Sequence, residues 1–555
     1  MKEGIKMDYK KLAVMLYPNI NKNINYYEEK YPKRDLPSNA VVTRFAPSPT
    51  GFVHMGSLRT AFIAKKIAED THGVFFLRIE DTDLKRSVDK GIQGIINDLA
   101  NFNIEIKEGR INENEDKGNY GPYLQSKRKE IYQTFAKSLI EKNLAYPCFC
   151  SEEDLNQIRI NQETKKERLG YYGRYAKCKY LSYEDIEQKV NQGIPFVLRL
   201  KSPGNFHKKI SCQDLIKGKI DFPENDLDII LLKSDGIPTY HFAHAIDDHL
   251  MRSTHILRGD EWLSSFPIHK QLFDLLNFEL PKYCHLAPVN KKDGDSIRKL
   301  SKRKDPEAAL SYYHEKGIPI KAVELYLMTT ANSNFEEWLN QNLDKGIEEF
   351  AFDFKKMSAS GSLFDLEKLL NISKNYISRL TANEVYDNIL VWSSIYDKEL
   401  HDLLKKYPDY SIKILNIERE QKKPRKDFAS WSEVKENIWY MYDELYDNKI
   451  INFVKVNNLE NYKQIINIYI NKYYDYNDDK ENWFSKIKKL SEEVGYAPDM
   501  RLYKENPNNY KGSVADISNI LRIALTTKDV SPDLFQIMKL LGEEKITQRF
   551  KKICG

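Results

Sequence analysis

The feature that most constrains the fold is a strand, a helix and a second strand near the start of the chain. The sequence VVTRFA at 41–46 predicts a strand, and the largely apolar run VFFLRIE at 74–80 predicts a second, buried strand. Between them, Leu58, Ala61 and Phe62 follow the i, i+3, i+4 spacing of a helix. Such a unit predicts a parallel sheet, and parallel sheets bind ligands at the carboxyl ends of their strands.

A proline- and glycine-rich loop, APSPTGFVHMGS at 46–57, joins the first strand to the helix. The prolines fix its backbone, and Gly56 lets main-chain N–H groups approach a bound group closely. The N-terminus of a helix favours phosphate, and His54 lies just before it, where the imidazole is placed to donate to a phosphate oxygen. Taken alone, the loop fits a structural turn that carries a surface histidine better than it fits a phosphate site.

A second loop, KLSKRKD at 299–305, places lysines and an arginine around a serine. This arrangement suits the gathering of negative charge that develops on a triphosphate during phosphoryl or adenylyl transfer. A basic run by itself is usually solvated surface. The two loops together, in this order and at this separation, are far more specific than either one.

The chain as a whole predicts several domains, because its 555 residues exceed what one hydrophobic core usually supports. After about residue 355 the pattern becomes helical to the end. There, Ser531 and Pro532 predict the N-cap and first position of a helix over DLFQIMKLL. The expected divisions are a helical extension at 1–40, two halves of a sheet domain at 41–145 and 233–355, an inserted domain at 146–232, and a helical region at 356–555.

Composition favours a cytoplasmic protein without membrane association. Hydrophobic residues make up 41% of the chain, and no stretch approaches the roughly 20 apolar residues that a membrane span needs. The N-terminal sequence lacks a small-residue cleavage site, so secretion is not expected. Six cysteines in so long a chain are too sparse for a disulfide framework.

Taken together, the motifs resemble those of one enzyme family. The combination of RFAPSPTG-x-x-H-x-G, LRIEDTD, PTYHFA-x-x-x-DDH, LRGDEW and KLSKR looks like a class I aminoacyl-tRNA synthetase, and among these it is similar to the bacterial glutamyl-tRNA synthetases. The resemblance runs from about residue 41 to the end. It implies a multidomain α/β protein, with a Rossmann-like parallel-sheet catalytic domain, an inserted acceptor-binding domain and an all-α anticodon-binding region.

The resemblance also implies a reaction. Glutamate and ATP, with Mg²⁺, would form glutamyl-adenylate, and the glutamyl group would pass to the 3′ end of tRNA-Glu, with a variant that also charges tRNA-Gln as the alternative. The enzyme is expected to act as a monomer. Family motifs assign catalysis to His54, Lys299 and Lys302. The implied ATP contacts are Pro47, Ser48, His54, Gly56, Lys299, Ser301, Lys302 and Arg303.

A pocket for glutamate is implied by the same motifs. Arg44 and Arg258 match the arginines of that pocket, and a guanidinium pairs bidentately with a carboxylate. Glu80 matches the residue that receives the α-ammonium group. A neutral glutamine would leave a buried arginine without its counter-ion, at a cost of about 3–5 kcal/mol. The implied glutamate contacts are Arg44, Ser48, Glu80, Tyr240, His244 and Arg258.

Cysteines at the start of the insert form a candidate metal site. Cys148 and Cys150 make a C-x-C motif, and Cys178 follows downstream. Some relatives bind structural zinc at this place, and three thiolates with Tyr171 would complete a tetrahedral set. Three buried free thiols are the alternative.

Two other functions share some of these features. One is a nucleotidyltransferase that uses no tRNA, and the long helical region argues against it. The other is an RNA-binding protein with an inactive catalytic fold, against which the intact His54, Glu80, Arg258 and Lys302 argue. A net charge of +5 is modest for a tRNA binder, so the basic residues must cluster. The candidate clusters are KRK at 302–304 and KKPRK at 422–426.

Overall fold

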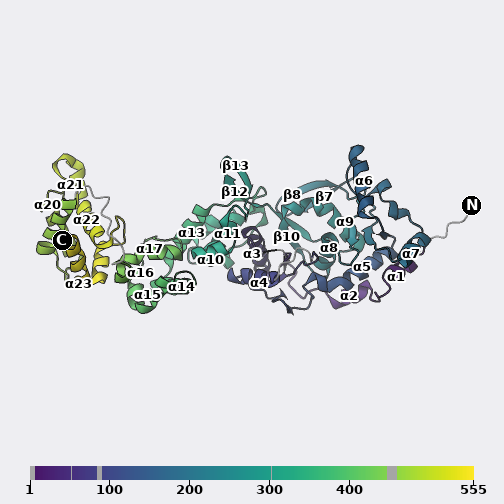
Figure 1. The fold of residues 1–555 in the computed structure, drawn as a ribbon, viewed down its shortest axis with the longest axis horizontal. Helices are drawn as coiled ribbons and strands as arrows, with labels where there is room; N and C mark the ends of the chain where they lie inside the picture. The colour runs from purple at the N-terminus through teal and green to yellow at the C-terminus, as the bar shows by residue number, and fades with distance from the viewer. Residues whose placement is uncertain are drawn as a thin grey trace, which may run out of the picture. The chain divides into compact units, whose positions relative to one another are not determined.

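The computed structural model describes most of the chain, which divides into two compact units. Figure 1 shows its helices and strands. Unit 1 comprises Met1–Leu310 and Glu324–Asp365, and unit 2 comprises Ser311–Val323 and Leu366–Gly555. The described residues are 7–49, 51, 53–83, 90–301, 303–446 and 459–554.

The predicted strand, helix and strand are confirmed in unit 1. They are β1 (Val42–Phe45), α3 (Met55–Asp70) and β2 (Val74–Leu77). The two strands pair in parallel over their whole length, and every residue of β1 is buried. The helix begins at Met55 because the His54 side chain accepts the backbone N–H of Ser57 and so caps it.

A second parallel pair extends this arrangement. β10 (His255–Gly259) pairs in parallel with β11 (Lys282–Leu286). β10 lies beside β1, because Thr254 N donates to Val42 O at 3.0 Å and Val42 N donates to Thr254 Oγ1 at 2.9 Å. The helices α8 (Tyr240–Leu250) and α9 (Phe266–Leu276) flank these strands in the sequence. The strand ends that carry the predicted site residues therefore meet at one edge.

The segment predicted as an insertion, 146–232, contributes to two sheets. β5 (Ala145–Cys148), β6 (Val197–Leu200) and β9 (Ile230–Leu232) form an antiparallel sheet. The hairpin of β7 (Lys209–Asp214) and β8 (Gly218–Pro223) joins β11 instead, with Asp214 opposite Tyr283. The hairpin is thus part of the sheet that contains β10 and β11. The five-part division of the chain stays a prediction.

Further elements complete unit 1. The hairpin of β12 and β13 leads into the 299–305 loop, and β14 pairs with β12. Their bounds, with those of the remaining helices of at least seven residues that lie within unit 1, are β12 (Val289–Asp293), β13 (Ser296–Lys299), β14 (Ser362–Leu363), α4 (Gly91–Asn101), α6 (Glu152–Thr164), α7 (Tyr183–Asn191) and α12 (Phe335–Gln341).

The N-terminal extension packs into the core of unit 1. α1 (Tyr9–Leu16) and α2 (Ile24–Lys30) contribute Leu12 and Tyr27 to the same buried cluster as α5 (Lys129–Glu141). The extension is therefore part of the hydrophobic core.

Ion pairs add a polar anchor to this packing. The Glu28 carboxylate lies 2.7 Å from His249 Nε2 and accepts from Arg252 Nη2 at 2.8 Å. Arg34 pairs with Glu108 at 2.6 Å, and both side chains are largely buried. Glu28 thus ties the extension to the C-terminal end of α8.

Unit 2 is helical in its described part, apart from one bridge between Ala497 and Ser513. A buried core that includes Trp431, Ile487 and Leu521 holds it together. Its helices include α10 (Ser311–Lys316), α13 (Leu366–Arg379), α14 (Ala382–Tyr396), α15 (Lys398–Lys406), α16 (Pro408–Leu415), α17 (Val434–Ile438), α18 (Asp443–Tyr446), α19 (Leu459–Ile468), α20 (Lys480–Glu493), α21 (Met500–Glu505), α22 (Val514–Thr526) and α23 (Leu534–Cys554), while α11 (Ile320–Ala331) is shared between the units.

The predicted start of the last helix is wrong by two residues. α23 begins at Leu534, and Asp533 Oδ1 accepts the backbone N–H of Gln536 at 2.9 Å, so Asp533 fulfils the capping role. The Ser531 carbonyl instead accepts from Arg522 and from Arg425. Of the helices that the structure describes, none has the length and apolar content to cross a bilayer.

We predict that Tyr27→Ala destabilises unit 1 by about 3 kcal/mol, because a large buried ring leaves a cavity. Tyr27 is 2% exposed, whereas the adjacent Tyr26 is 43% exposed. Tyr26→Ala is the matched control and should change the stability by no more than about 0.5 kcal/mol. Scanning calorimetry of both variants measures the difference, and equal unfolding temperatures would show that the extension is not part of the core.

Candidate active site

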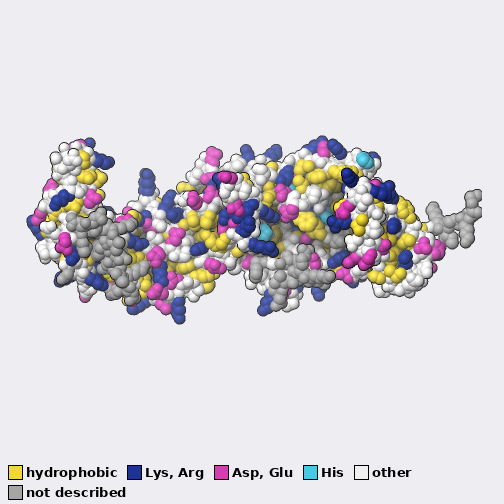
Figure 2. All heavy atoms as spheres, turned by 45° about the horizontal axis from the view of Figure 1, so that its top comes forward, with side chains coloured by type: hydrophobic (Ala, Val, Ile, Leu, Met, Phe, Trp, Pro, Cys, Tyr) yellow, Lys and Arg dark blue, Asp and Glu magenta, His cyan; other side chains and the backbone are white. Residues whose placement is uncertain are grey.

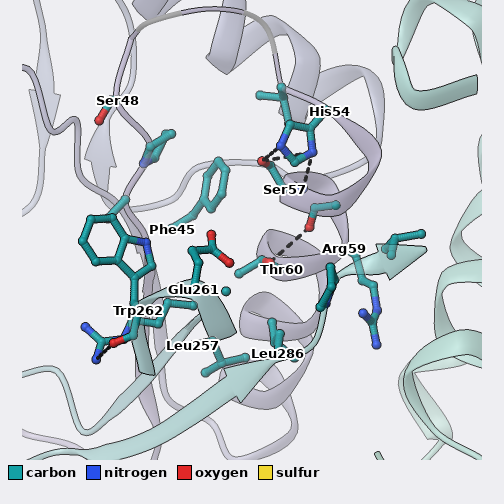
Figure 3. Close-up of a pocket in the computed structure, with 18 of the residues that line it drawn as sticks. Phe45, Ser48, His54, Ser57, Arg59, Thr60, Leu257, Glu261, Trp262 and Leu286 are labelled. Carbon is teal, nitrogen blue, oxygen red and sulfur yellow. Dashed lines mark hydrogen bonds between the residues drawn. The ribbon is translucent and has the colours of Figure 1, made fainter. Parts of the chain in front are cut away.

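A pocket of about 520 Å³ lies at the edge where the parallel strands end (Figure 3). Its walls come from β1 and the following loop, the start of α3, the ends of β2, β10 and β11, and the end of β13. The 46–57 loop and Lys299, the first residue of the 299–305 loop, therefore line one cavity. The predicted site residues that line it are Arg44, Pro47, Ser48, His54, Gly56, Glu80, Tyr240, Arg258 and Lys299.

His54 has a defined orientation at the N-terminus of α3. Its Nδ1 accepts the backbone N–H of Ser57 at 3.1 Å (Figure 3). In the neutral ring the proton is therefore on Nε2. A Cβ atom on Gly56 would lie 3.1 Å from His54 Cε1. The glycine therefore leaves room for the imidazole, a role that the sequence did not indicate.

Arg44 is paired with a buried carboxylate. Its Nε donates to Asp248 Oδ1 at 2.9 Å, and its Nη1 donates to the Leu257 carbonyl at 3.3 Å. The same Asp248 accepts from Arg78 Nη1 at 2.9 Å, and Arg78 in turn pairs with Glu80 at 3.1 Å. Burial raises the pKa of Glu80, although Arg78 and Arg44 act in the opposite direction. The charge of Arg44 is thus balanced inside the protein.

Arg258 has a different environment. Its Nε donates to His285 Nε2 at 3.0 Å, its Nη1 lies 3.0 Å from His269 Nδ1, and its Nη2 donates to the Trp262 carbonyl at 3.3 Å. Within the described ranges, no carboxylate lies within ion-pairing distance of this guanidinium. Arg258 therefore brings an unbalanced positive charge to the pocket wall.

His244, predicted as a glutamate contact, does not line the pocket. It is fully buried, with Nδ1 2.6 Å from Asp248 Oδ2 and Nε2 3.0 Å from the Tyr283 hydroxyl. Its ring stacks on that of Tyr240, with centroids 5.9 Å apart. Because Tyr240 does line the pocket, His244 lies one side chain behind the wall.

The remaining predicted ATP contacts belong to the 299–305 loop. Ser301 does not line the pocket, and its backbone N–H donates to Asp305 Oδ2 at 2.9 Å. Arg303 is exposed and lies outside the pocket lining. Lys302, predicted to be catalytic, lies outside the described residues. Arg298 donates to Asp305 at 2.6 and 2.8 Å, which anchors the base of the loop.

Several pocket residues were not predicted from the sequence. The Glu261 carboxylate points into the cavity between Trp262 and Thr60 (Figure 3). Trp262 packs against Tyr240, with ring centroids 4.1 Å apart. Arg59 is buried, and burial lowers its pKa to about 10. The LRGDEW motif contained Glu261 and Trp262, but its pattern alone assigned no role to either of them.

Comparison with protein families identifies this arrangement. A model described as tRNA synthetases class I (E and Q), catalytic domain, matches residues 40–371. The chain belongs to this family of class I tRNA synthetases. It is therefore an enzyme of the ligase class. A second model, described as an anticodon binding domain, matches residues 508–554 of the synthetase, within unit 2.

Relatives of this synthetase are similar over the whole chain. A glutamate–tRNA ligase of Clostridium perfringens strain SM101 is 48% identical over 552 residues, covering 99% of this chain and 100% of that protein. One from Acetivibrio thermocellus is also 48% identical, over 549 residues, with the same coverage. A crystal structure of a glutamate tRNA ligase from Elizabethkingia meningosepticum, in complex with its amino acid, has a TM-score of 0.70 at 24% identity, covering 93% of this chain and 99% of that one. The last of these supports the fold.

The predicted cysteine cluster of the synthetase is assembled at the end of β5. The Sγ atoms of Cys148, Cys150 and Cys178 all lie within 4.8 Å of one another. The Tyr171 hydroxyl is 3.5 Å from Cys148 Sγ and 3.3 Å from Cys150 Sγ. Three neighbouring thiols, with a hydroxyl close to two of them, fit the donor set of a tetrahedral zinc site, for which Zn–S bonds of about 2.3 Å place the sulfur atoms about 3.8 Å apart.

Basic residues on the surface are mixed with acidic ones on the face shown in Figure 2. Within the predicted 422–426 cluster, the side chains of Lys422, Lys423 and Lys426 are exposed. Arg425 is partly balanced by ion pairs with Glu418 and Asp427. The exposed lysines are the part of this cluster available to an external anion.

Buried neutral histidines predict loss of stability in acid. Burial lowers the pKa of His244 to about 3 and those of His241 and His255 to about 4. In the unfolded chain each would titrate near 6.5. Between about pH 6.5 and 4 the unfolded state binds more protons, so stability falls as pH falls, by about 1.4 kcal/mol per pH unit for each histidine.

Unfolding temperatures measured from pH 7.5 to 4.5 test this prediction. His255→Phe should show a shallower decline than the wild type, because one titrating group is removed. His255 is a suitable choice because it does not line the pocket and stacks on Phe354. A wild-type midpoint that stays constant across this range would contradict the prediction.

Proposed function

We propose that this synthetase joins L-glutamate to the 3′ end of tRNA-Glu, using ATP and passing through a glutamyl-adenylate. The observation that carries the proposal is the unbalanced charge of Arg258 at the pocket wall. A substrate with a carboxylate side chain supplies the missing counter-ion, whereas a neutral amide does not. The names of the relatives agree with this choice.

In the proposed complex, ATP occupies the part of the pocket near His54. The N-terminus of α3 and the imidazole Nε2–H face the phosphates, and Lys299 with Lys302 stabilises charge as pyrophosphate leaves. In-line attack by the glutamate α-carboxylate on the α-phosphate then needs mainly positioning, which the pocket walls supply. We propose the same ATP contacts that the sequence motifs implied. Ser301 does not line the pocket and would act by holding the 299–305 loop in place.

Glutamate binds deeper in the pocket in this proposal. Its side-chain carboxylate pairs with Arg258, and its α-ammonium group faces Glu80. Tyr240 and Trp262 form an aromatic wall beside it. Arg44 and His244 then act mainly by fixing Asp248 and Tyr240, since Arg44 is already paired and His244 lies behind the wall.

Mg²⁺ is expected to enter with ATP. It usually keeps several waters and is bound through substrate phosphates with one or two carboxylates. Within the described part of the pocket lining, Glu80 and Glu261 are the carboxylates. Glu261 points into the cavity, and we propose it as the residue that holds the hydrated ion (Figure 3).

Pyrophosphate exchange with labelled ATP tests the reaction. Exchange that requires glutamate and tRNA, followed by charging of purified tRNA-Glu, supports the proposal, and tRNA-Gln assayed beside it reports the selectivity. Absence of exchange would indicate an RNA-binding protein with an inactive catalytic fold. Exchange with another acid and no need for RNA would indicate a nucleotidyltransferase.

We predict that Arg258→Gln raises the KM for glutamate by at least about a hundredfold, since an ion pair worth about 3–5 kcal/mol is lost. The KM for ATP should change little. Arg159→Gln is the matched control, because Arg159 is 67% exposed on α6 and lies outside the pocket. If Arg258→Gln keeps the wild-type KM for glutamate, the pocket assignment is wrong.

We further propose that Cys148, Cys150, Cys178 and Tyr171 hold a structural Zn²⁺. When bound, the ion would cross-link the end of β5 to the segment around Cys178 and take no part in catalysis. Tyrosine is an uncommon zinc ligand, so the three thiolates would supply most of the affinity. The mutual approach of the three thiols, and the contacts of the Tyr171 hydroxyl with two of them, support this assignment.

Metal analysis of the purified protein should give about one zinc per chain. Cys150→Ser should lose the metal, whereas Cys554→Ser should keep it, because Cys554 is a similarly half-buried cysteine outside the cluster. A metal-free wild type whose unfolding temperature does not respond to added zinc would favour three free thiols instead.

A further inference from the structure

A buried chain of hydrogen bonds connects the β7–β8 hairpin to Arg258. Asp214 Oδ2 lies 2.7 Å from His285 Nδ1 and also accepts the backbone N–H of His285 at 3.0 Å. On the other side of the imidazole, Arg258 Nε donates to His285 Nε2 at 3.0 Å. Asp214 is 1% exposed and His285 is fully buried. The three side chains thus form one continuous line from carboxylate to guanidinium.

The strand register places these residues next to one another. Arg258 on β10 is directly opposite His285 on β11, and Asp214 on β7 is opposite Tyr283 on the same β11 strand. Neighbouring parallel strands therefore hold all three backbones in a fixed relation. The line is built into the sheet rather than into a loop.

The proton positions along this line follow from its ends. An ionised carboxylate only accepts hydrogen bonds, so His285 Nδ1 must carry the proton. His285 Nε2 then has a lone pair, which accepts from Arg258 Nε. Burial lowers the pKa of His285, although the hydrogen bond to Asp214 acts in the opposite direction. The lowered pKa agrees with a neutral ring. The imidazole is therefore an acceptor toward the arginine.

Asp214 is itself held in place. Its Oδ1 accepts the backbone N–H groups of Ile216 at 2.9 Å and Lys217 at 2.8 Å. Burial alone would raise its pKa, but the hydrogen bonds from His285, Lys217 and Ile216 lower it overall. The carboxylate accepts four hydrogen bonds, which fix both of its oxygens.

A second neutral imidazole holds the other side of the guanidinium. His269 Nδ1 lies 3.0 Å from Arg258 Nη1, and His269 Nε2 lies 2.9 Å from His241 Nδ1. Burial lowers the pKa of both histidines. Arg258 is thus oriented from two directions by acceptors that carry no charge.

Arg44 shows what a direct carboxylate would do in this pocket. Asp248 contacts Arg44 at 2.9 Å and balances its charge within the protein. At Arg258 an imidazole stands between the carboxylate and the guanidinium. That spacing fixes the orientation of the guanidinium and leaves most of its charge for the pocket, since the attraction weakens with distance.

We propose that Asp214 and His285 are positioning residues that orient Arg258 as the unbalanced cation of the pocket and thereby set its preference for an acidic amino acid. The inference rests on the proposed function, because it takes glutamate as the substrate. Neither residue lines the pocket, so both act through Arg258. The amino-acid site accordingly depends on a hairpin from the segment predicted as an insertion.

The decisive variant is His285→Phe, which keeps a flat ring and removes the acceptor. It should raise the KM for glutamate about tenfold or more, the value of one hydrogen bond to a charged group. The KM for ATP and kcat should change by less than about threefold, because transition-state contacts are retained. His285→Gln offers an amide oxygen to Arg258 and should recover most of the loss.

Asp214→Asn is the second variant, and it leaves both Arg258 and His285 in the chain. An amide cannot accept at both oxygen positions, so it must lose the contact with either His285 or the backbone. The KM for glutamate should rise in the same direction, and discrimination against glutamine should fall. Cys284→Ala is the control, because Cys284 is fully buried on the same strand and lies outside the pocket lining.

The proposed function and the positioning role fail in different ways. If the wild-type protein shows no glutamate-dependent pyrophosphate exchange, both the proposed function and the positioning inference are wrong. If the wild type is active and the KM for glutamate is unchanged in His285→Phe and Asp214→Asn, only the positioning inference is wrong. Equal losses in both KM values and kcat across these variants and Cys284→Ala, with no recovery in His285→Gln, would show a general structural role and would also overturn it. Should His285→Phe fail to fold, Asp214→Asn and His285→Gln distinguish these outcomes.

Discussion

The carboxylate of Asp248 is the contact on which the catalytic half of the molecule depends. It is buried at the end of α8 and accepts from Arg44 on β1 and from Arg78, which follows β2. Burial alone would raise its pKa, but these two arginines hold it well below its usual range. Loss of this carboxylate would leave two buried guanidinium groups without their main counter-ion, a defect of several kcal/mol. The neighbouring Asp247 binds Arg128 in the same way, so α8 joins several parts of the fold through charge.

Two arginines in one pocket thus acquire different properties from their partners. Arg44 faces a carboxylate, and Arg258 faces two neutral imidazoles. Arg44 is therefore a structural residue, and Arg258 is the one that we propose pairs with the substrate carboxylate. The chemistry of the pocket therefore depends on which groups lie behind its wall. His244 illustrates the same point, since it contacts Asp248 and stacks on Tyr240 without reaching the cavity.

The sequence predicted those features that follow from local pattern. Periodicity located β1, α3 and β2, and the rule for parallel strands placed the loop that carries His54, and Glu80, near one edge. Arg258 was assigned to the pocket only through the family resemblance. The sequence did not predict the line from Asp214 to Arg258, because pairing of β7 with β11 is decided by tertiary structure across 71 residues. The capping error at α23 has a local cause: Ser531 and Asp533 both suit an N-cap, and bonds from Arg522 and Arg425 decide between them. The close approach of the His54 ring to Gly56 likewise could not be predicted from the sequence, because it depends on the orientation of the imidazole.

The path of the chain through β7 and β8 limits how the segment 146–232 could be exchanged between relatives. Between β6 and β9 the backbone leaves one sheet, contributes a hairpin to another, and returns. Removal of the whole segment 146–232 would therefore also remove β7 and β8 from the sheet that contains β10 and β11. A segment taken from a relative would have to supply an equivalent hairpin to that sheet. Recombination between relatives should be tolerated only where both parents exchange the hairpin together with the strands that receive it.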